Sequence, residues 1–164
     1  MTLTGAQMLM TSKQYRHTST LAAVTATLFM LACGGRPAAQ TADDAAATLA
    51  EFHDAMRSGD SALVLQLLAP DVVIYEGGSA EASREEYGSH HLPADMRYAA
   101  TTTRHATVER TGTASDIAWV LSRVHTTGTY DGRAVDRGSV ETVIFRREPE
   151  GWRIIHIHWS ASRQ

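Results

Sequence analysis

The sequence predicts one α+β domain: a cone-like, curved and mostly antiparallel sheet with three N-terminal helices that enclose a pocket. Helical periodicity is confined to the region before residue 98, and four long runs rich in Thr, Val, Ile and Trp follow it. Size supports a single domain, because about 120 of the 164 residues remain after the N-terminal segment, enough for one hydrophobic core. A second domain does not fit.

Composition excludes several classes of protein. A hydrophobic content of 43% with 20% charged residues is ordinary for a globular domain, so neither a disordered nor a fibrous chain is expected. Lys13 is the only lysine among 15 basic residues, and the arginines are scattered along the chain. Nucleic-acid binding requires a clustered basic surface, so no nucleic-acid partner is expected.

Residues 1–32 are predicted to be a secretory signal peptide. The segment has no acidic residue, carries Lys13 and Arg16, and continues with an apolar run over 21–30 that is too short to span a bilayer. The only cysteine, Cys33, follows Leu31-Ala32, and this order resembles the lipobox of bacterial lipoproteins. The resemblance implies cleavage before Cys33 and its lipidation, which accounts for an exported cysteine without a disulfide partner.

This interpretation divides the chain into a signal peptide, a lipidated tether over 33–40 and a folded domain over 41–164. Acyl chains would hold the protein in the cell envelope, in the periplasm or at the outer surface, without a spanning helix. The alternative is an ordinary cleaved signal peptide with an incidental cysteine, because Met30 stands where the lipobox prefers leucine.

The first two helices are predicted from their end signals. A cap at Thr41, followed by acids in the first turn, begins the first helix, and Gly59 ends it. Asp60 offers a second cap, and Pro70 stops the short apolar helix that follows. Together they form a helical hairpin whose apolar side is expected to pack against a sheet.

A strand and a third helix follow. The β-branched and aromatic run over 71–75 predicts a first strand, closed by the pair Gly77-Gly78. Ser83 and Glu86 have the spacing of a capping box, so a third helix is expected to begin there, to run to about His91 and to be ended by Pro93.

The second half of the chain predicts an antiparallel meander. Four strands are expected over about 100–110, 117–127, 134–147 and 152–160. Turn sequences separate them at 111–112, 130–132 and 148–151.

This order of elements resembles the nuclear transport factor 2-like superfamily with its cystatin-like fold, in particular the SnoaL-like bacterial branch. The residues that carry the resemblance are Ala55–Asp60, Leu68–Val72, Val143–Arg147 and Gly151–Ser160. It implies a cone whose cavity is lined by the last strand, and a homodimer formed through the exposed face of the sheet. It does not name a reaction, because the superfamily includes isomerases, dehydratases, cyclases and oligomerisation modules.

Two histidines in the last strand are the main candidates for chemistry. His156 and His158 are two residues apart and share one face of the strand, whereas Ile157 and Trp159 share the other. The resemblance implies that the histidines face the cavity. Alternation alone leaves the opposite assignment open, with Ile157 and Trp159 against the helices.

Further polar residues are expected near the mouth of the cone. The predicted ligand-binding residues are Tyr75, Glu76, His90, His91, His156 and His158. Within this set, His91, His156 and His158 would suit zinc or copper, although a polar lining without metal or solvent-exposed histidines fit the same spacing. No cofactor is certain.

Two functions remain open. The favoured one is a binding module for a small molecule, because no nucleophile motif, phosphate loop or cofactor fingerprint is present. The alternative is an acid/base enzyme of the dehydratase or isomerase type, with His156 or His158 exchanging a proton and Glu76 as partner. His53 is expected to be a packing or surface residue, and Glu141 a surface residue, with a position facing the pocket as the alternative.

Overall fold

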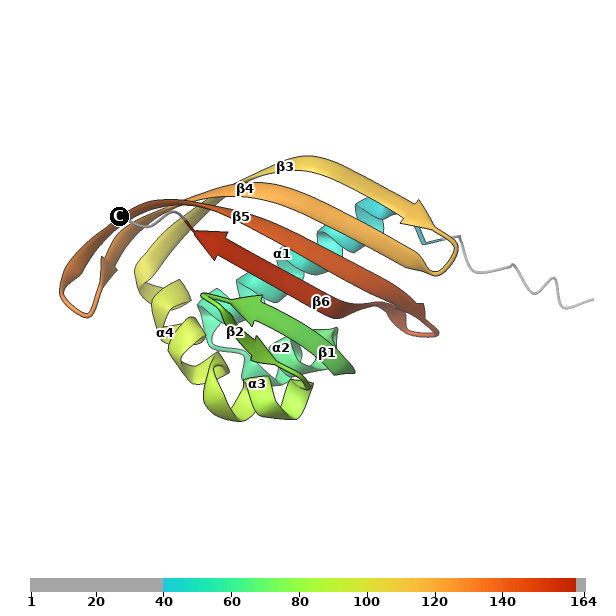
Figure 1. Cartoon of the computed structure of the whole chain (residues 1–164), viewed down its shortest axis with the longest axis horizontal. Helices are drawn as coiled ribbons and strands as arrows, with labels where there is room; N and C mark the ends of the chain where they lie inside the picture. The colour runs from blue at the N-terminus through green and yellow to red at the C-terminus, as the bar shows by residue number, and fades with distance from the viewer. Residues whose placement is uncertain (1–39, 162–164) are drawn as a thin grey trace, which may run out of the picture. The chain divides into compact units, whose positions relative to one another are not determined.

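A long first helix and a curved six-stranded sheet dominate the computed structural model, which describes residues 40–161 (Figure 1). These residues fall within one compact unit. The predicted signal peptide and Cys33 lie outside the described residues. In the part of the chain that is described, no helix is both long and apolar enough to cross a membrane.

Helix α1 (Ala42–Ser58) begins and ends where the sequence predicts. The Thr41 hydroxyl accepts a hydrogen bond from the backbone N–H of Asp44, and the Asp44 carboxylate accepts one from the backbone N–H of Thr41. This reciprocal pair satisfies N–H groups that the helix itself leaves unbonded. Gly59 ends the helix with a φ of +85°, a left-handed conformation that glycine adopts without steric cost.

Helix α2 (Ser61–Leu67) leads directly into strand β1 (Leu68–Glu76). As predicted, the Asp60 side chain caps the helix, accepting from the backbone N–H of Leu63. The helix ends before Pro70, which lies inside the strand instead of directly stopping the helix. The strand pairing is irregular between Leu68 and Val73, where a proline without an N–H is tolerated.

The region after β1 contains more structure than the sequence predicts. The Gly77-Gly78 pair forms the turn to a short strand β2 (Ser79–Glu81), which pairs antiparallel with β1. Helix α3 (Arg84–His90) follows from the predicted Ser83 cap. It ends at His90, close to the predicted end before Pro93. A fourth helix that was not predicted, α4 (Leu92–Thr101), follows, and Pro93 lies in its first turn, where a backbone N–H would have no partner within the helix.

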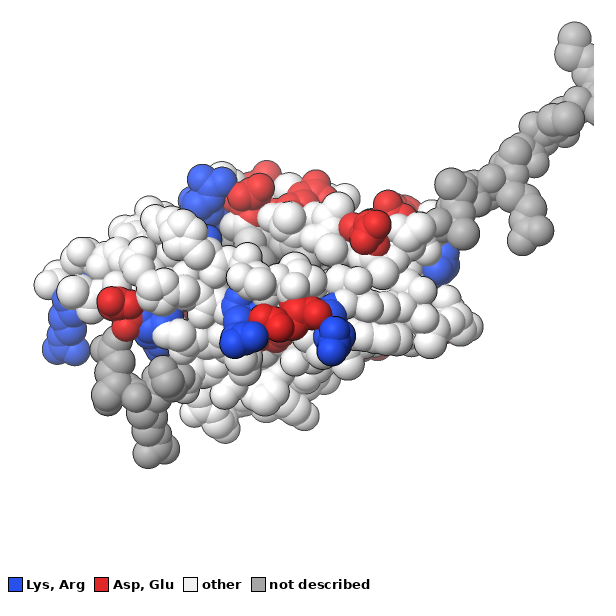
Figure 2. Space-filling view, turned by 90° about the horizontal axis from the view of Figure 1, so that it is seen from above, with Lys and Arg blue, Asp and Glu red and all other residues white. Residues whose placement is uncertain are grey.

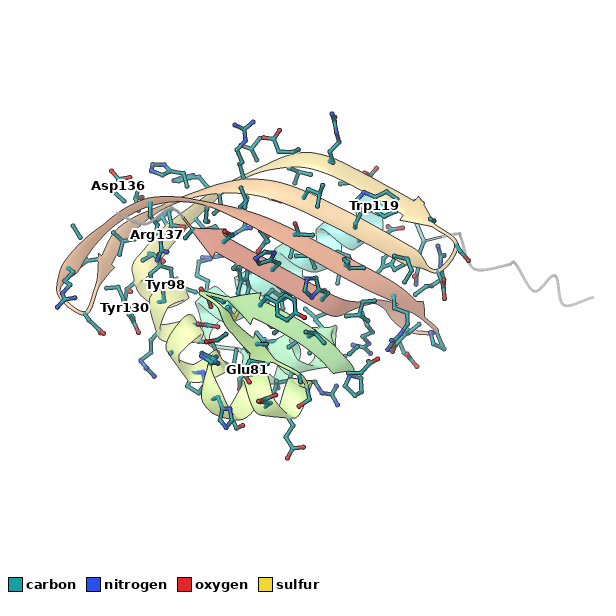
Figure 3. The ribbon with its side chains drawn as sticks, viewed as in Figure 1. Glu81, Tyr98, Trp119, Tyr130, Asp136 and Arg137 are labelled. Carbon is teal, nitrogen blue, oxygen red and sulfur yellow. The ribbon has the colours of Figure 1, made fainter. Side chains whose placement is uncertain are left out.

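The four long strands confirm the predicted meander. They are β3 (Thr102–Ala114), β4 (Ile117–Tyr130), β5 (Arg133–Glu148) and β6 (Gly151–Ala161). The strand order is β2-β1-β6-β5-β4-β3, and β1 and β6 form the one parallel pair of this sheet. At its far end the β4–β5 hairpin contacts α4 through the rings of Tyr130 and Tyr98, whose centroids lie 5.2 Å apart (Figure 3).

The predicted turn at residues 111–112 is wrong, because β3 continues through Gly112 to Ala114. Gly112 pairs with Trp119 on β4, and a Cβ built on Gly112 would lie 2.2 Å from the Trp119 ring. The glycine is therefore needed for close packing of the indole. The actual turn contains Ser115, with a φ of +57°.

The hydrophobic core lies between the helices and one face of the sheet, here called the inner face; the opposite side is the outer face (Figure 1). On β4 and β5 the buried residues alternate as a two-residue period requires. The largest fully buried apolar side chains are Phe52, Tyr87, Phe145, Leu68, Ile154, Ile157, Val64, Val72, Val120 and Val143.

Candidate functional site

A cavity of about 170 Å³ lies where the β1–β2 hairpin meets α3 and the start of α4. We call it the Glu76 pocket; its lining residues are Ile74, Glu76, Ser79, Glu81, Tyr87 and His91. Figure 3 labels Glu81 beside α3. The pocket combines an apolar wall with several groups that exchange protons, which is typical of binding and active sites.

Glu81 and His91 form a hydrogen-bonded pair in the pocket. The Glu81 side chain is buried, and its Oε1 atom is hydrogen-bonded to His91 Nδ1. Its second oxygen, Oε2, is also buried and has no hydrogen-bond partner among the described residues. A buried carboxylate oxygen without a partner is energetically costly, so this atom requires an explanation.

Tyr87 and Asp95 form a second pair on the helical side. The Tyr87 hydroxyl, which is fully buried, donates a hydrogen bond to Asp95 Oδ2 at 2.9 Å. Burial raises the pKa of Asp95, although the bond from Tyr87 works in the opposite direction. Burial and the charge of Asp95 also raise the pKa of Tyr87, so this hydroxyl remains protonated.

Glu76 lies at the rim of the pocket, where solvent reaches its side chain. The surrounding protein still removes enough water to raise the pKa of Glu76, and the negative charge of Asp95 raises it further. The charges of His91 and Arg137 act in the opposite direction but do not cancel the effect. Glu76 is therefore a stronger proton acceptor than an ordinary glutamate and remains accessible to a ligand.

A second polar cluster, the Glu141 network, comprises Glu141, His53, Arg104 and Trp159. Glu141 is 2% exposed, and its Oε2 atom lies 2.8 Å from His53 Nε2 and 2.7 Å from the Trp159 indole nitrogen, which donates to it. The Arg104 guanidinium donates to Oε1 at 2.6 Å. Burial alone would raise the pKa of Glu141, but His53, Arg104 and Trp159 together lower it.

The two clusters are neighbours on the inner face. Glu76 is paired with Trp159 between β1 and β6, and Trp159 is paired with Glu141 between β6 and β5. The prediction that Glu141 is a surface residue is therefore wrong. Its two-residue spacing from the buried Val143 and Phe145 is a signal that could have placed it inside.

His156 and His158 lie on the outer face, so the prediction that they face the cavity is wrong. Ile157 is fully buried and Trp159 packs against the core, whereas His158 is exposed. The larger apolar side chains occupy the face that the helices cover, and the strand period turns both imidazoles to the other side. Ile154 is also inside, because a bulge at Ile155 shifts the alternation.

Tyr75 accompanies the two histidines on the outer face and does not line the pocket. Its ring lies edge-on to His156 and His158, with centroid distances of 5.1 and 6.2 Å. His156 Nδ1 also lies 2.8 Å from the backbone oxygen of Val73. On the face seen in Figure 2, acidic and basic side chains are interspersed on a mostly uncharged surface.

The structure does not bring the predicted metal ligands together. His91 binds Glu81 in the Glu76 pocket, whereas His156 and His158 lie on the far side of the sheet. One ion cannot contact all three. Of the predicted ligand-binding residues, Glu76 and His91 line the pocket, and the exposed His90 lies next to it, 3.7 Å from Glu81. Asp95, Tyr87 and Glu81 had no sequence signal beyond their residue types.

Comparison with known proteins identifies the family. The sequence profile of the SnoaL-like domain matches residues 45–164. The chain belongs to this family. A crystal structure of a proposed ketosteroid isomerase from Shewanella frigidimarina NCIMB 400 is 38% identical, covers 71% of this chain and 94% of its own, and has a TM-score of 0.68. No protein in a search of curated sequences matches this SnoaL-like chain.

More distant structures support the fold. A proposed dehydratase of the nuclear transport factor 2-like family from Streptomyces avermitilis is 21% identical, with a TM-score of 0.60 over 75% of this chain and 96% of its own. A nuclear transport factor 2-like superfamily protein from Salmonella enterica is 17% identical, with a TM-score of 0.62 over 75% and 92%. The predicted α+β fold is thereby confirmed, and the match of the SnoaL-like profile confirms the SnoaL-like branch of the predicted superfamily.

Proposed function

We propose that the Glu76 pocket binds a small carbonyl compound and transfers a proton at a carbon atom next to its carbonyl group. The observation that carries this proposal is the position of Glu76, at the accessible rim of a cavity that the buried Tyr87 also lines. Such a reaction requires a base that reaches the substrate and a proton donor that stabilises the enolate.

Glu76 is suited to the role of base. Its raised pKa brings it closer to the operating pH, where proton transfer by a general base is most efficient. Asp95 adjoins the pocket through its hydrogen bond to the lining residue Tyr87, and burial raises its pKa towards the protonated form, which can donate a hydrogen bond. Burial is the larger cause of the raised pKa of Glu76 and does not depend on the charge of Asp95. Tyr87 orients Asp95 through the bond to Oδ2.

The pocket size limits what enters it. A cavity of about 170 Å³ is smaller than the roughly 300–1,000 Å³ of pockets that enclose a whole drug-sized ligand. We therefore infer a small substrate, or a larger one whose reacting end alone is enclosed. The similarity to a protein described as a proposed ketosteroid isomerase supports the reaction class, because that name denotes proton transfer next to a carbonyl.

Hydrogen–deuterium exchange tests the proposal. A panel of small ketones and aldehydes is incubated with the chain in D₂O, and loss of the signal of the α-proton is followed by NMR. We expect exchange above the buffer rate that falls by at least about 100-fold in Glu76→Gln. Glu51→Gln changes an exposed glutamate of α1 and is the matched control.

The same panel distinguishes catalysis from binding alone. A compound that raises the melting temperature without α-proton exchange would make the pocket a binding module and would contradict the enzymatic proposal. Binding at a hundredfold excess over Kd stabilises the folded state by about 2.7 kcal/mol, which a thermal-shift assay detects.

We also propose that the protein is exported and held in the cell envelope by lipid on Cys33. The support is the order of a basic, acid-free start, a short apolar run and the only cysteine. Mass spectrometry of the native membrane fraction is expected to show a mature chain that begins at an acylated Cys33. An intact N-terminus, or a soluble chain with an unmodified cysteine, would contradict this proposal.

A homodimer formed through the outer face is the third proposal. The exposed Tyr75 and Val140 lie on strands that present this face. Sedimentation velocity is expected to give twice the mass of one chain, and Val140→Glu is expected to restore the single mass by placing a charge in the contact. A monomer at micromolar concentration would contradict it.

A further inference from the structure

We propose that Glu81, Glu86 and His90 form a zinc-binding site on the α3 side of the Glu76 pocket. One ligand atom from each of these residues lies within 4.8 Å of the other two. Among the described residues, this is the one set of three His, Cys, Asp or Glu side chains whose ligand atoms lie this close together. The site goes beyond the proposed proton-transfer function and does not depend on it.

The local fold places these three side chains on one side of α3. Glu86 and His90 are four residues apart on the helix, so they project from the same face. The Ser83 cap holds the first turn, with the backbone N–H of Glu86 donating to the Ser83 hydroxyl. The Glu86 carboxylate accepts a hydrogen bond from the backbone N–H of Ala82 at 2.7 Å, which orients it next to the end of β2.

The unpaired oxygen of Glu81 is the independent observation that indicates a ligand. The Glu81 side chain is 8% exposed, and Oε2 has no hydrogen-bond partner among the described residues. It lies 3.7 Å from His90 Nδ1, which is too long for a hydrogen bond. Two ligands of a tetrahedral zinc ion, each about 2.0–2.1 Å from the metal, lie about 3.3 Å apart, so a small movement of His90 accommodates the ion.

The chemistry of the three side chains favours zinc. One imidazole and two carboxylates match the mixed nitrogen and oxygen ligands that zinc accepts, and the two negative charges balance its charge. His91 would not bind the ion. Its hydrogen bond to Oε1, the other oxygen of Glu81, would orient this ligand. Three protein ligands leave a fourth position for water or another small ligand.

The competing explanation is an ion pair without metal, in which a protonated His90 approaches Glu81 Oε2. This pair would satisfy the same oxygen but would not require Glu86. The two explanations therefore differ in the effect of zinc and in the role of Glu86.

Calorimetric titration of the purified, chelator-treated full-length chain with Zn²⁺ tests the site. We expect one ion per chain, with affinity reduced by at least about tenfold in His90→Ala and in Glu86→Gln. His125→Ala is the control, since His125 is an exposed histidine of β4 that pairs with Asp136, and its loss is expected to leave binding unchanged. Because His90 is 62% exposed, its replacement is not expected to disturb folding, which circular dichroism checks.

Co²⁺ absorption is the second readout, because a four-coordinate ion gives strong visible bands that depend on the ligand set. Absence of Zn²⁺ binding overturns the proposal and supports the ion pair. Equal affinity of wild type and His90→Ala, or equal losses in His90→Ala and His125→Ala, also overturns it, since the ion would then bind elsewhere. None of these outcomes affects the exchange test of Glu76.

Discussion

The Glu141 network and the Glu76 pocket are two acidic clusters on the inner face of one sheet. They differ in how completely their acids are hydrogen-bonded and in the direction in which the pKa values shift. Glu141 accepts hydrogen bonds from an indole and a guanidinium and contacts His53, and its pKa is lowered. At the pocket, burial raises the pKa of Glu76 and of the adjoining Asp95, and Glu81 Oε2 has no hydrogen-bond partner among the described residues. A fully partnered buried acid stabilises a fold, whereas an incompletely partnered acid is available for a proton, a ligand or an ion.

Removing the acid of the Glu141 network should have the largest effect on stability. Glu141→Ala leaves the His53, Arg104 and Trp159 donors without their acceptor, and we expect a loss of about 3 kcal/mol in the free energy of unfolding. Urea unfolding at pH 7 measures it. Glu76→Ala is the comparison and should lower the free energy of unfolding by less than about 0.5 kcal/mol. Equal losses in the two variants would contradict the proposed difference between the clusters.

The pH dependence of α-proton exchange tests the pocket side of the comparison. If Glu76 is the base, the rate rises with pH through its raised pKa and falls about tenfold per pH unit below it. The midpoint is expected above 4.5, the ordinary value for glutamate. His91, Asp95 and Arg137 also act on Glu76, so Arg137→Ala should move the midpoint upward. A rate independent of pH between 4 and 8 contradicts the assignment.

Two histidine variants compare the inner and outer faces. His53→Ala removes a contact of the buried Glu141, and we expect a loss of about 1–2 kcal/mol. His158→Ala deletes an exposed ring, so its cost should stay within about 0.5 kcal/mol. Thermal unfolding of both variants measures the difference, and a larger loss in His158→Ala would show that the outer face carries an essential contact.

The smallest expected effect is the change in the free energy of unfolding at acidic pH that arises from Glu141. Because the folded pKa of Glu141 is lowered, its ionised form stabilises the protein fully above the ordinary value of 4.5, and this contribution is lost as pH falls through the lower folded pKa. Glu141→Gln has no such titration. The difference in unfolding free energy between wild type and Glu141→Gln should therefore narrow as pH falls below 4.5, and a constant difference would contradict the lowered pKa.

Helix ends and strands were predictable because their signals are local. The Thr41–Asp44 capping box and the Asp60 cap act within three residues, and the structure confirms both. The end of α3 at His90 agrees with the predicted end before Pro93, but the sequence analysis missed α4. Proline is compatible with the first turn of a new helix as well as with the end of the previous one, so the local signal does not distinguish a loop from a further helix.

The sequence by itself determined the periodicity of the last strand, but the tertiary structure decided which side of it faces inward. Alternation grouped His156 with His158 and Ile157 with Trp159, and it left both assignments open. The helices cover the apolar side, because burying Ile157 and Trp159 gains more free energy than burying two imidazoles that would need partners.

The same limit applies to both polar clusters. His53 and Glu141 are 88 residues apart in sequence, and His91, between α3 and α4, follows Glu81 of β2 by 10 residues, so no local sequence pattern predicts either contact. Residue type determined which side chains can exchange a proton or bind an ion. Which acids gained hydrogen-bond partners was decided only by the packing of the sheet against the helices, since this depends on contacts that form after the elements are in place.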